Sequence, residues 1–307
     1  MSSLIWTEEA DVTLVSGEQT TRFLNGQLSA GIESLGLGQA QRSLLLDPDG
    51  SMVAPLGVQM LGDNEYALFS PFGTGIEVHK RLERFRLRTK VGFTFSSGCV
   101  IHLSGESEAQ IAELSSLIDA NVHSSGFTPL RQVGEIFVKQ YYSTVGCDEI
   151  AGFLSDVEFF DRSMIARILA GEPAWGFEIK AGMNPTELGE HYIRSSADFQ
   201  KGCYTGQELI ERVDSRGYKT PKRLTNFLIR FADLESTTLD SLEFEVAGKL
   251  AFNITSYRYY EPGDCGIALG FTHRLGGEFL TKVSTEFCDV HCVELGNLRK
   301  AIALVQG

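Results

Sequence analysis

The chain has 307 residues, of which 43% are hydrophobic and 22% are charged, so it can bury a full core and is expected to divide into two or three domains. Its net charge of −13 disfavours direct binding to nucleic acid or to an acidic membrane, because most of the surface repels a polyanion. No run is long and apolar enough to span a bilayer, and residues 1–11 lack the basic flank and apolar stretch of a signal peptide.

The first strand-to-helix unit of the chain has an echo later in the sequence. Residues 13–18 and residues 101–106 each run from an apolar strand into a predicted helix. Ser16 and Ser104 are the predicted N-caps, and each is followed two positions later by an acidic residue, which complements the helix dipole. The echo predicts a duplicated core substructure, residues 1–42 and 98–222, interrupted by an insertion.

The insertion, residues 43–97, is predicted to be a small α+β domain. Its turn at residues 47–50 combines a Pro, which presets one dihedral, with a Gly that supplies a positive φ, so a hairpin is expected. The basic residues from Lys80 to Lys90, Arg81 among them, are predicted to lie on the exposed side of the insertion. The expected elements are strands at 44–46, 53–60, 66–69 and 91–95 and an amphipathic helix at 76–85.

From residue 223 to residue 307 short strands alternate with turns, which predicts a separate all-β domain. One of these strands carries Cys288, His291 and Cys292, residue types that suit zinc. Its end cysteines lie about 13 Å apart in a strand, too far to share an ion, so core packing is expected and no metal is predicted in the isolated chain. The expected strands are 224–231, 242–246, 267–271, 281–293 and 301–305.

The segment with the densest chemistry is residues 201–208. Thr205 and Glu208 have the spacing of a capping box, which predicts a helix that begins here and ends near Gly217. Glycines at the second and sixth positions permit a tight loop. The segment consists of Lys201, Gly202, Cys203, Tyr204, Thr205, Gly206, Gln207 and Glu208.

Cys203 is the candidate reactive group of this segment. It precedes a predicted helix N-terminus and lies two residues from Lys201, and both features stabilise a thiolate. The alternative is a small buried side chain that fills the bend. We favour the reactive interpretation because the glycines, the lysine and the predicted cap occur together. The six cysteines are otherwise scattered, unlike a secreted disulfide framework, which predicts a reducing, cytoplasmic setting.

Residues 201–208 resemble the signature of the YgfZ family, which belongs to the glycine-cleavage T-protein superfamily, and of its mitochondrial iron-sulfur assembly relative. The resemblance covers nearly the whole chain. It extends to residues 17–27, 167–176 and 184–187, to Arg216 and Gly217, and to Arg223 and Leu224.

The resemblance implies an α+β fold of three T-protein-like domains around a central channel, with a β-barrel-like C-terminal domain. It also implies tetrahydrofolate in the channel and support of iron-sulfur enzymes or their assembly factors, a tRNA methylthiotransferase among them, through Cys203. The alternatives are a folate-dependent aminomethyltransferase and a non-catalytic interaction scaffold. Whether the chain is an enzyme is left open, because residues 70–75 hold no counterpart of the aminomethyltransferase aspartate.

The candidate folate contacts depart from the family at one position. Relatives carry a carboxylate where this chain has Leu169, and Leu cannot accept N–H donors from a pteridine. Glu178 is the candidate replacement. Arg212, Arg216, Lys219, Lys222 and Arg223 are a candidate site for a polyglutamate tail or other anion, or else a solvated helix end. The candidate folate-binding residues are Asn25, Gln27, Arg167, Trp175 and Glu178.

Overall fold

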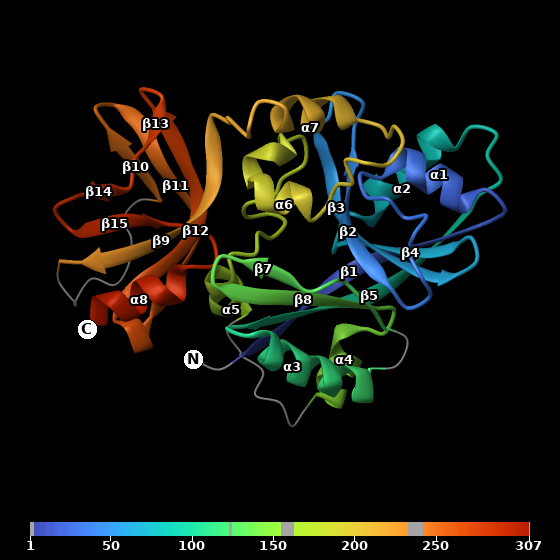
Figure 1. The fold of residues 1–307 in the computed structure, drawn as a ribbon, viewed down its shortest axis with the longest axis horizontal. Helices are drawn as coiled ribbons and strands as arrows, with labels where there is room; N and C mark the ends of the chain where they lie inside the picture. The colour runs from blue at the N-terminus through green and yellow to red at the C-terminus, as the bar shows by residue number, and fades with distance from the viewer. Residues whose placement is uncertain (1–2, 123–124, 155–162, 233–241, 307) are drawn as a thin grey trace.

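The computed structural model describes residues 3–122, 125–154, 163–232 and 242–306 (Figure 1). It contains helices and two antiparallel sheets, in agreement with the α+β prediction. The strand order of the first sheet is β2 (Ala40–Leu46), β3 (Met52–Gly62), β4 (Glu65–Pro71), β1 (Leu4–Ser16), β5 (Gly92–Gly105), β8 (Ile136–Ser143) and β6 (Ser125–Phe127), with β7 (Arg131–Val133) beside β8.

The long strands β1 and β5 are the centre of this sheet. They pair antiparallel from Leu4↔Ser104 to Ser16↔Gly92. The strands expected at 91–95 and before residue 106 are therefore two ends of one continuous strand, β5. The hairpin expected around residues 47–50 is present between β2 and β3. Strands of the predicted insertion and of the predicted core thus belong to one sheet, and the domain limits stay a prediction.

Helices cover different regions of the first sheet. Apolar residues of α1 and α2 pack with β3 and β4, whereas those of α3 and α4 pack on β5 and β8, below the sheet in Figure 1. Leu4 and Trp6 of β1, on the face away from α3 and α4, pack with α5. The helices are α1 (Thr20–Gln27), α2 (Gly75–Arg86), α3 (Glu108–Asn121), α4 (Cys147–Phe153) and α5 (Ser163–Ala170).

The predicted N-caps of the two repeated units are wrong. Helix α1 begins at Thr20, with Gln19 at the N-cap, and Ser16 ends β1. Ser104 is buried within β5, and Ser107 caps α3 by accepting a hydrogen bond from the Gln110 amide. Both helices begin three residues later than expected, because each strand continues through the serine to pair with its neighbour.

The second sheet is a nearly closed barrel, as the prediction of a β-barrel-like C-terminal domain expects. The expected strand 281–293 is instead a hairpin of β14 and β15. In β15, Cys288 and Cys292 pack in the hydrophobic core, which confirms the core interpretation. The strand order is β10 (Glu243–Val246), β11 (Lys249–Tyr260), β12 (Cys265–Leu275), β9 (Lys222–Phe231), β15 (Cys288–Val293) and β14 (Lys282–Ser284), with β13 (Glu278–Phe279) beside β12.

The expected strand 301–305 is wrong, because these residues belong to helix α8 (Leu298–Gln306). Leu298 and Ile302 lie four positions apart, the spacing of one helix face, and both are buried. Together with Ile168 of α5 and Leu269 of β12 they belong to one hydrophobic core that both sheets share. The two sheets are therefore held together by a common apolar interior.

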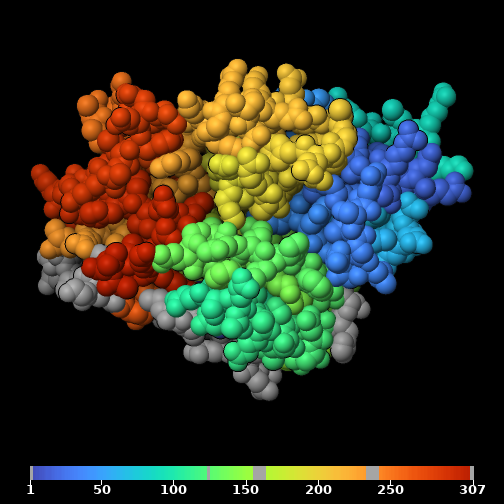
Figure 2. Space-filling model, in the orientation of Figure 1, coloured from blue at the N-terminus to red at the C-terminus, as the bar shows by residue number. Residues whose placement is uncertain are grey.

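The chain between α5 and β9 bridges the two sheets. In Figure 2 this yellow segment lies between the blue N-terminal part and the orange C-terminal part. The bridging segment contains η1 (Pro185–Leu188), α6 (Glu190–Arg194) and α7 (Gln207–Asp214). A further short helix, η2 (Glu261–Gly263), follows β11.

No helix within the described residues is long and apolar enough to cross a membrane.

Candidate functional site

A cavity of about 360 Å³ lies between the first sheet and the segment that follows α5. Strands β1, β2, β5 and β8 contribute to its wall, and residues 164–179 line the opposite side. Its volume lies within the range of about 300–1,000 Å³ that is usual for small-molecule sites. The cavity is therefore the candidate binding site.

Arg42 and Glu172 line the cavity and form a compact charged network with Arg131. Glu172 lies 2.6 Å from an Nη of Arg42 and 3.5 Å from an Nη of Arg131. Burial opposes the charge of the Glu172 carboxyl, but the two guanidinium groups lower its pKa to about 2. Burial and the nearby Arg42 lower the pKa of Arg131 to about 10. Two cations thus share one carboxylate.

A second polar array lines the same cavity, formed by Glu8, His102, Gln140 and Tyr142. Its members come from β1, β5 and β8, which the register of the sheet brings side by side. Sequence reasoning missed these residues, as it missed Arg42, Arg131 and Glu172. Only Glu172 carried a sequence signal, because it directly follows Gly171 in a segment that resembles the family.

Arg167 lines the cavity, and Glu178 lies directly behind it. The Glu178 side chain is 0% exposed and lies 2.6 Å from an Nη of Arg167. Its oxygens also accept hydrogen bonds from the Ala174 amide and from the hydroxyls of Thr255 and Ser256 in β11. These partners occupy both carboxylate oxygens, so Glu178 joins the cavity wall to the second sheet.

Trp175 is the aromatic candidate that lies at the cavity. It is half-buried and lines the cavity together with Phe177, which is also close to the Arg167 guanidinium. Trp6 and Phe23 are buried in hydrophobic cores. A flat aromatic surface is therefore available to a ligand at Trp175 and Phe177.

Cys203 lies in an exposed loop directly before α7 and is a free thiol. None of residues 201–208 lines the cavity within the described part of the chain. Strand β2 connects the cavity with the loop of residues 201–208, because Arg42 lines the cavity and Leu46 contacts Gly206. Those two positions are about 13 Å apart along a strand. The residues predicted from the sequence therefore lie in two places, the cavity and the separate loop of residues 201–208, which we call the thiol loop.

Lys201 anchors the thiol loop to the end of α1. Its Nζ donates hydrogen bonds to the carbonyl oxygens of Asn25, Leu28 and Ala30 at 2.6, 2.8 and 2.9 Å. These acceptors take up all three ammonium protons. Burial lowers the pKa of Lys201 to about 8. A cation at a helix C-terminus also complements the helix dipole, so Lys201 has a structural role besides its predicted one.

The capping box predicted for Thr205 and Glu208 is wrong. Gly206 occupies the N-cap of α7 with φ +84°, a conformation that favours glycine. The Thr205 amide donates to the Gly26 carbonyl of α1 instead. The Gln207 side chain reaches back to accept from the Tyr204 amide at 2.8 Å. Helix α7 therefore begins one residue later than predicted, because the amide of the predicted cap residue, Thr205, has a tertiary partner.

Arg81 lies beneath this loop rather than on the exposed side of α2, so its predicted exposure is wrong. It is 5% exposed. Its guanidinium donates to the Leu46 carbonyl at 2.7 Å and to Gln27 Oε1 at 3.1 Å, and its Nε lies 3.2 Å from Asp47. Gln27 Oε1 also accepts from the Thr205 hydroxyl at 3.4 Å. Gln27 thus belongs to the thiol loop's support rather than to the cavity wall.

The remaining predicted polar residues lie outside the cavity wall. Asn25 is in the last turn of α1, and its Oδ1 accepts from the Ile32 amide. The basic residues Arg212, Arg216 and Lys219 are exposed on and after α7, whereas Lys222 pairs with Glu187. Within the described ranges, no three His, Cys, Asp or Glu residues form a group that would hold a metal ion.

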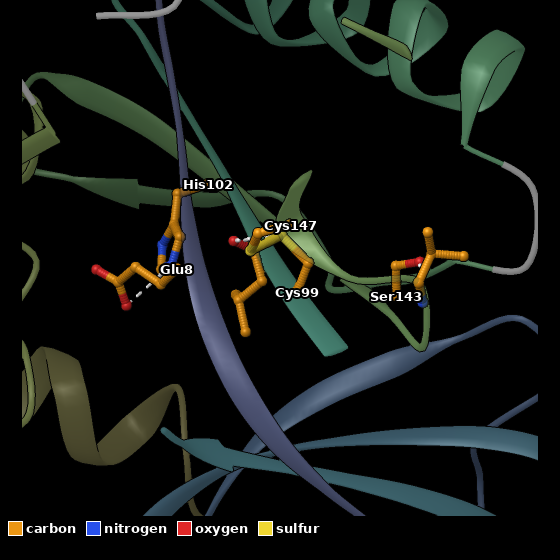
Figure 3. Close-up of a disulfide and its surroundings, with 7 residues drawn as sticks. Glu8, Cys99, His102, Ser143 and Cys147 are labelled. Carbon is orange, nitrogen blue, oxygen red and sulfur yellow. Dashed lines mark hydrogen bonds and ion pairs between the residues drawn. A yellow bond between two sulfur atoms is a disulfide. The ribbon is translucent and has the colours of Figure 1, made fainter. Parts of the chain in front are cut away.

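Cys99 of β5 and Cys147 of α4 form a disulfide (Figure 3). The bond lies among the apolar residues between the sheet and α3 and α4, on the other side of β5 from the cavity. The scattered spacing of the cysteines gave no indication of this pair, because the two sulfurs meet only when α4 packs on the sheet. The disulfide does not agree with the reducing setting that this spacing predicted.

Comparison with known proteins gives both sequence and structural matches, although no family model matches the chain. A tRNA-modifying protein YgfZ from Aliivibrio fischeri is 22% identical over 265 residues, which cover 84% of this chain and 81% of the relative. An uncharacterized protein from Haemophilus influenzae is 24% identical over 220 residues, or 71% and 70% of the two chains.

One solved structure that matches is aminomethyltransferase T of the glycine cleavage system from Bartonella henselae. The TM-score is 0.66 at 14% identity, over 96% of this chain and 86% of that chain. The fold is therefore that of the glycine-cleavage T-protein. Together with the sequence likeness, it supports a YgfZ-type member of the T-protein-like superfamily, which confirms the resemblance seen in the signature segment.

Proposed function

We propose that the chain binds a tetrahydrofolate in the cavity beside Arg42 and Glu172 and that it supports iron-sulfur enzymes in the cytoplasm through Cys203. The observation that carries the proposal of folate binding is the cavity itself, which has an aromatic surface at Trp175 and the charged side chains of Arg42 and Glu172 on its wall. A flat heterocycle with a polar edge suits this combination.

Arg42 on the cavity wall supports a ligand with an anionic end. Together with Arg131 it shares the single carboxylate of Glu172, so this cluster holds two guanidinium groups for one carboxylate. Buried charge without full compensation is costly, and a ligand carboxylate near Arg42 would lower that cost. Tetrahydrofolate carries carboxylates on the end opposite to its pterin ring.

The position of Cys203 supports a role toward another protein. The thiol is exposed on a loop that Lys201 fixes to α1, whereas the cavity is lined by other residues. A thiol outside a small-molecule cavity can reach a partner thiol or a cluster ligand on an approaching protein. The alternative function, a folate-dependent aminomethyltransferase, would instead require the aminomethyl donor to react inside the cavity.

Tetrahydrofolate is expected to raise the melting temperature of the wild-type protein, because a ligand that binds only the native state stabilises it by about 2.7 kcal/mol at one hundred times its Kd. Trp175→Ala should reduce this shift by removing the aromatic surface. Phe287→Ala, which removes an exposed aromatic side chain in the loop before β15, is the matched control and should leave the shift unchanged. Differential scanning fluorimetry measures all three.

Equal melting temperatures with and without tetrahydrofolate would refute the binding proposal. The same samples test the aminomethyltransferase alternative, because methylene-tetrahydrofolate produced from an aminomethyl donor would establish that activity in its place.

Cys203→Ala is expected to keep its stability within about 0.5 kcal/mol, because the side chain is exposed, and to lose support of iron-sulfur enzymes. The measurement is the activity of such an enzyme in cells that carry the variant as their only copy. Cys292→Ala removes another free cysteine, from β15, and should retain support. Full activity with Cys203→Ala would exclude the thiol mechanism.

A further inference from the structure

The imidazole of His102 is held in one orientation at the cavity wall. The ring stacks on Trp6 with centroids 4.7 Å apart and planes at 11°, and His102 is 5% exposed. The Tyr142 hydroxyl donates to Gln140 Oε1 at 3.1 Å, which turns the Gln140 Nε2 toward His102 Nδ1, also at 3.1 Å. Because Nδ1 accepts this hydrogen bond, the ring carries its proton on Nε2.

The protonated Nε2 lacks a well-formed hydrogen bond. It lies 3.5 Å from Glu8 Oε2, beyond the usual N–H···O distance of about 2.7–3.2 Å. No other acceptor reaches it among the described residues. The contact with Glu8 is longer than a normal hydrogen bond, so the Nε2–H remains available to an acceptor on a ligand.

Glu8 offers the complementary acceptor. Its side chain is 41% exposed because it opens onto the cavity, and it points away from the disulfide, on the same side as His102 (Figure 3). Burial opposes the charge of the Glu8 carboxyl, but His102, helped by Arg167, keeps its pKa below the usual value. The carboxyl is therefore ionised at neutral pH and accepts hydrogen bonds.

The other buried carboxylates at the cavity are already occupied. Glu172 is engaged by Arg42 and Arg131, and Glu178 has four internal donors. Glu9 also lines the cavity, but it is exposed, and its side chain points to the opposite face of β1 from that of Glu8. Glu8 and His102 thus form the acceptor and donor that a ligand edge would meet on this wall.

We infer that Glu8 and His102 together recognise the edge of a 2-amino-4-oxopyrimidine ring. The carboxylate would accept the two N–H donors of the 2-amino group and N3, and His102 Nε2–H would donate to the 4-oxo group. This assignment rests on the proposed function for the identity of the ligand. The same edge is present in pterins and in guanine, so the chemistry is shared and the experiment separates the two sources.

The test is isothermal titration of the full chain with pterin, with lumazine and with guanosine. Lumazine replaces the 2-amino group by an oxygen that repels a carboxylate, so the wild type should bind pterin at least about tenfold more tightly. Glu8→Gln should lose this preference and His102→Phe should weaken pterin binding. Glu113→Gln, at an exposed position of α3, is the control and should behave as wild type.

Melting temperatures of the variants establish that they are folded. Equal binding of pterin and lumazine by the wild type, or unchanged selectivity in folded Glu8→Gln, would overturn the inference. Tight guanosine binding that depends on Glu8 would support recognition of the 2-amino-4-oxopyrimidine edge and would show that the ligand is a guanine rather than a pterin.

Tetrahydrofolate titrations keep the two proposals distinguishable. If tetrahydrofolate binds wild type and Glu8→Gln equally, the Glu8 assignment fails and the proposed function stands. If tetrahydrofolate does not bind while pterin binds through Glu8, the proposed function fails and the assignment stands.

Discussion

Arg167→Ala should lower the free energy of unfolding by about 3 to 5 kcal/mol, because it leaves the Glu178 carboxylate buried without its cation. The two side chains are 4% and 0% exposed and lie 2.6 Å apart. Arg167 also donates to the Glu172 carbonyl and to the Ser256 hydroxyl of β11, so its loss loosens the connection between the cavity wall and the second sheet. Equilibrium unfolding in urea measures the change.

Two comparisons separate the buried charge from general damage. The double variant Arg167→Met with Glu178→Leu removes both charges and should be more stable than Arg167→Ala. Lys300→Ala breaks an exposed ion pair with Glu135 and should change stability by no more than about 1 kcal/mol. A loss below about 1 kcal/mol for Arg167→Ala would contradict the role given to this pair.

Acid should remove about 3 kcal/mol of stability through Glu172. Burial acts to raise the pKa of the Glu172 carboxyl, but the charges of Arg42 and Arg131 outweigh burial and lower the pKa from 4.5 to about 2. A carboxyl with a depressed pKa stabilises the fold fully above its unfolded-state pKa and loses that contribution as pH falls through the folded value. The loss should therefore occur between about pH 4.5 and pH 2.

The measurement is the free energy of unfolding in urea across that pH range for the wild type and for Glu172→Gln. The variant lacks the titrating group, so its stability should fall less steeply with acid. Glu113→Gln removes an exposed carboxyl of α3 and should retain the wild-type slope. Identical slopes for wild type and Glu172→Gln would show that the two arginines do not stabilise this carboxylate.

The thiol loop shows which structural features a local sequence pattern can predict and which it cannot. The segment 201–208 predicted a tight, glycine-containing loop before a helix, and Cys203 lies in a loop before α7, where it is a free and exposed thiol. The identity of the cap was not predictable, because the Thr205 amide is taken by Gly26, a residue far away in the sequence. Arg81 was misassigned for the same reason, since its acceptors come from β2 and α1.

The sequence by itself determined the alternation of strands and turns in the C-terminal part, the β2–β3 hairpin, the helix after Cys203 and the resemblance to the YgfZ family. These depend on near neighbours: periodicity and turn residues act over a few positions. Only the tertiary structure decided that Glu8 meets His102, that Arg42 and Arg131 share Glu172, and that α8 is a helix. The partners of buried charges and the final packing depend on sheet register and helix docking, which join residues that no local pattern connects.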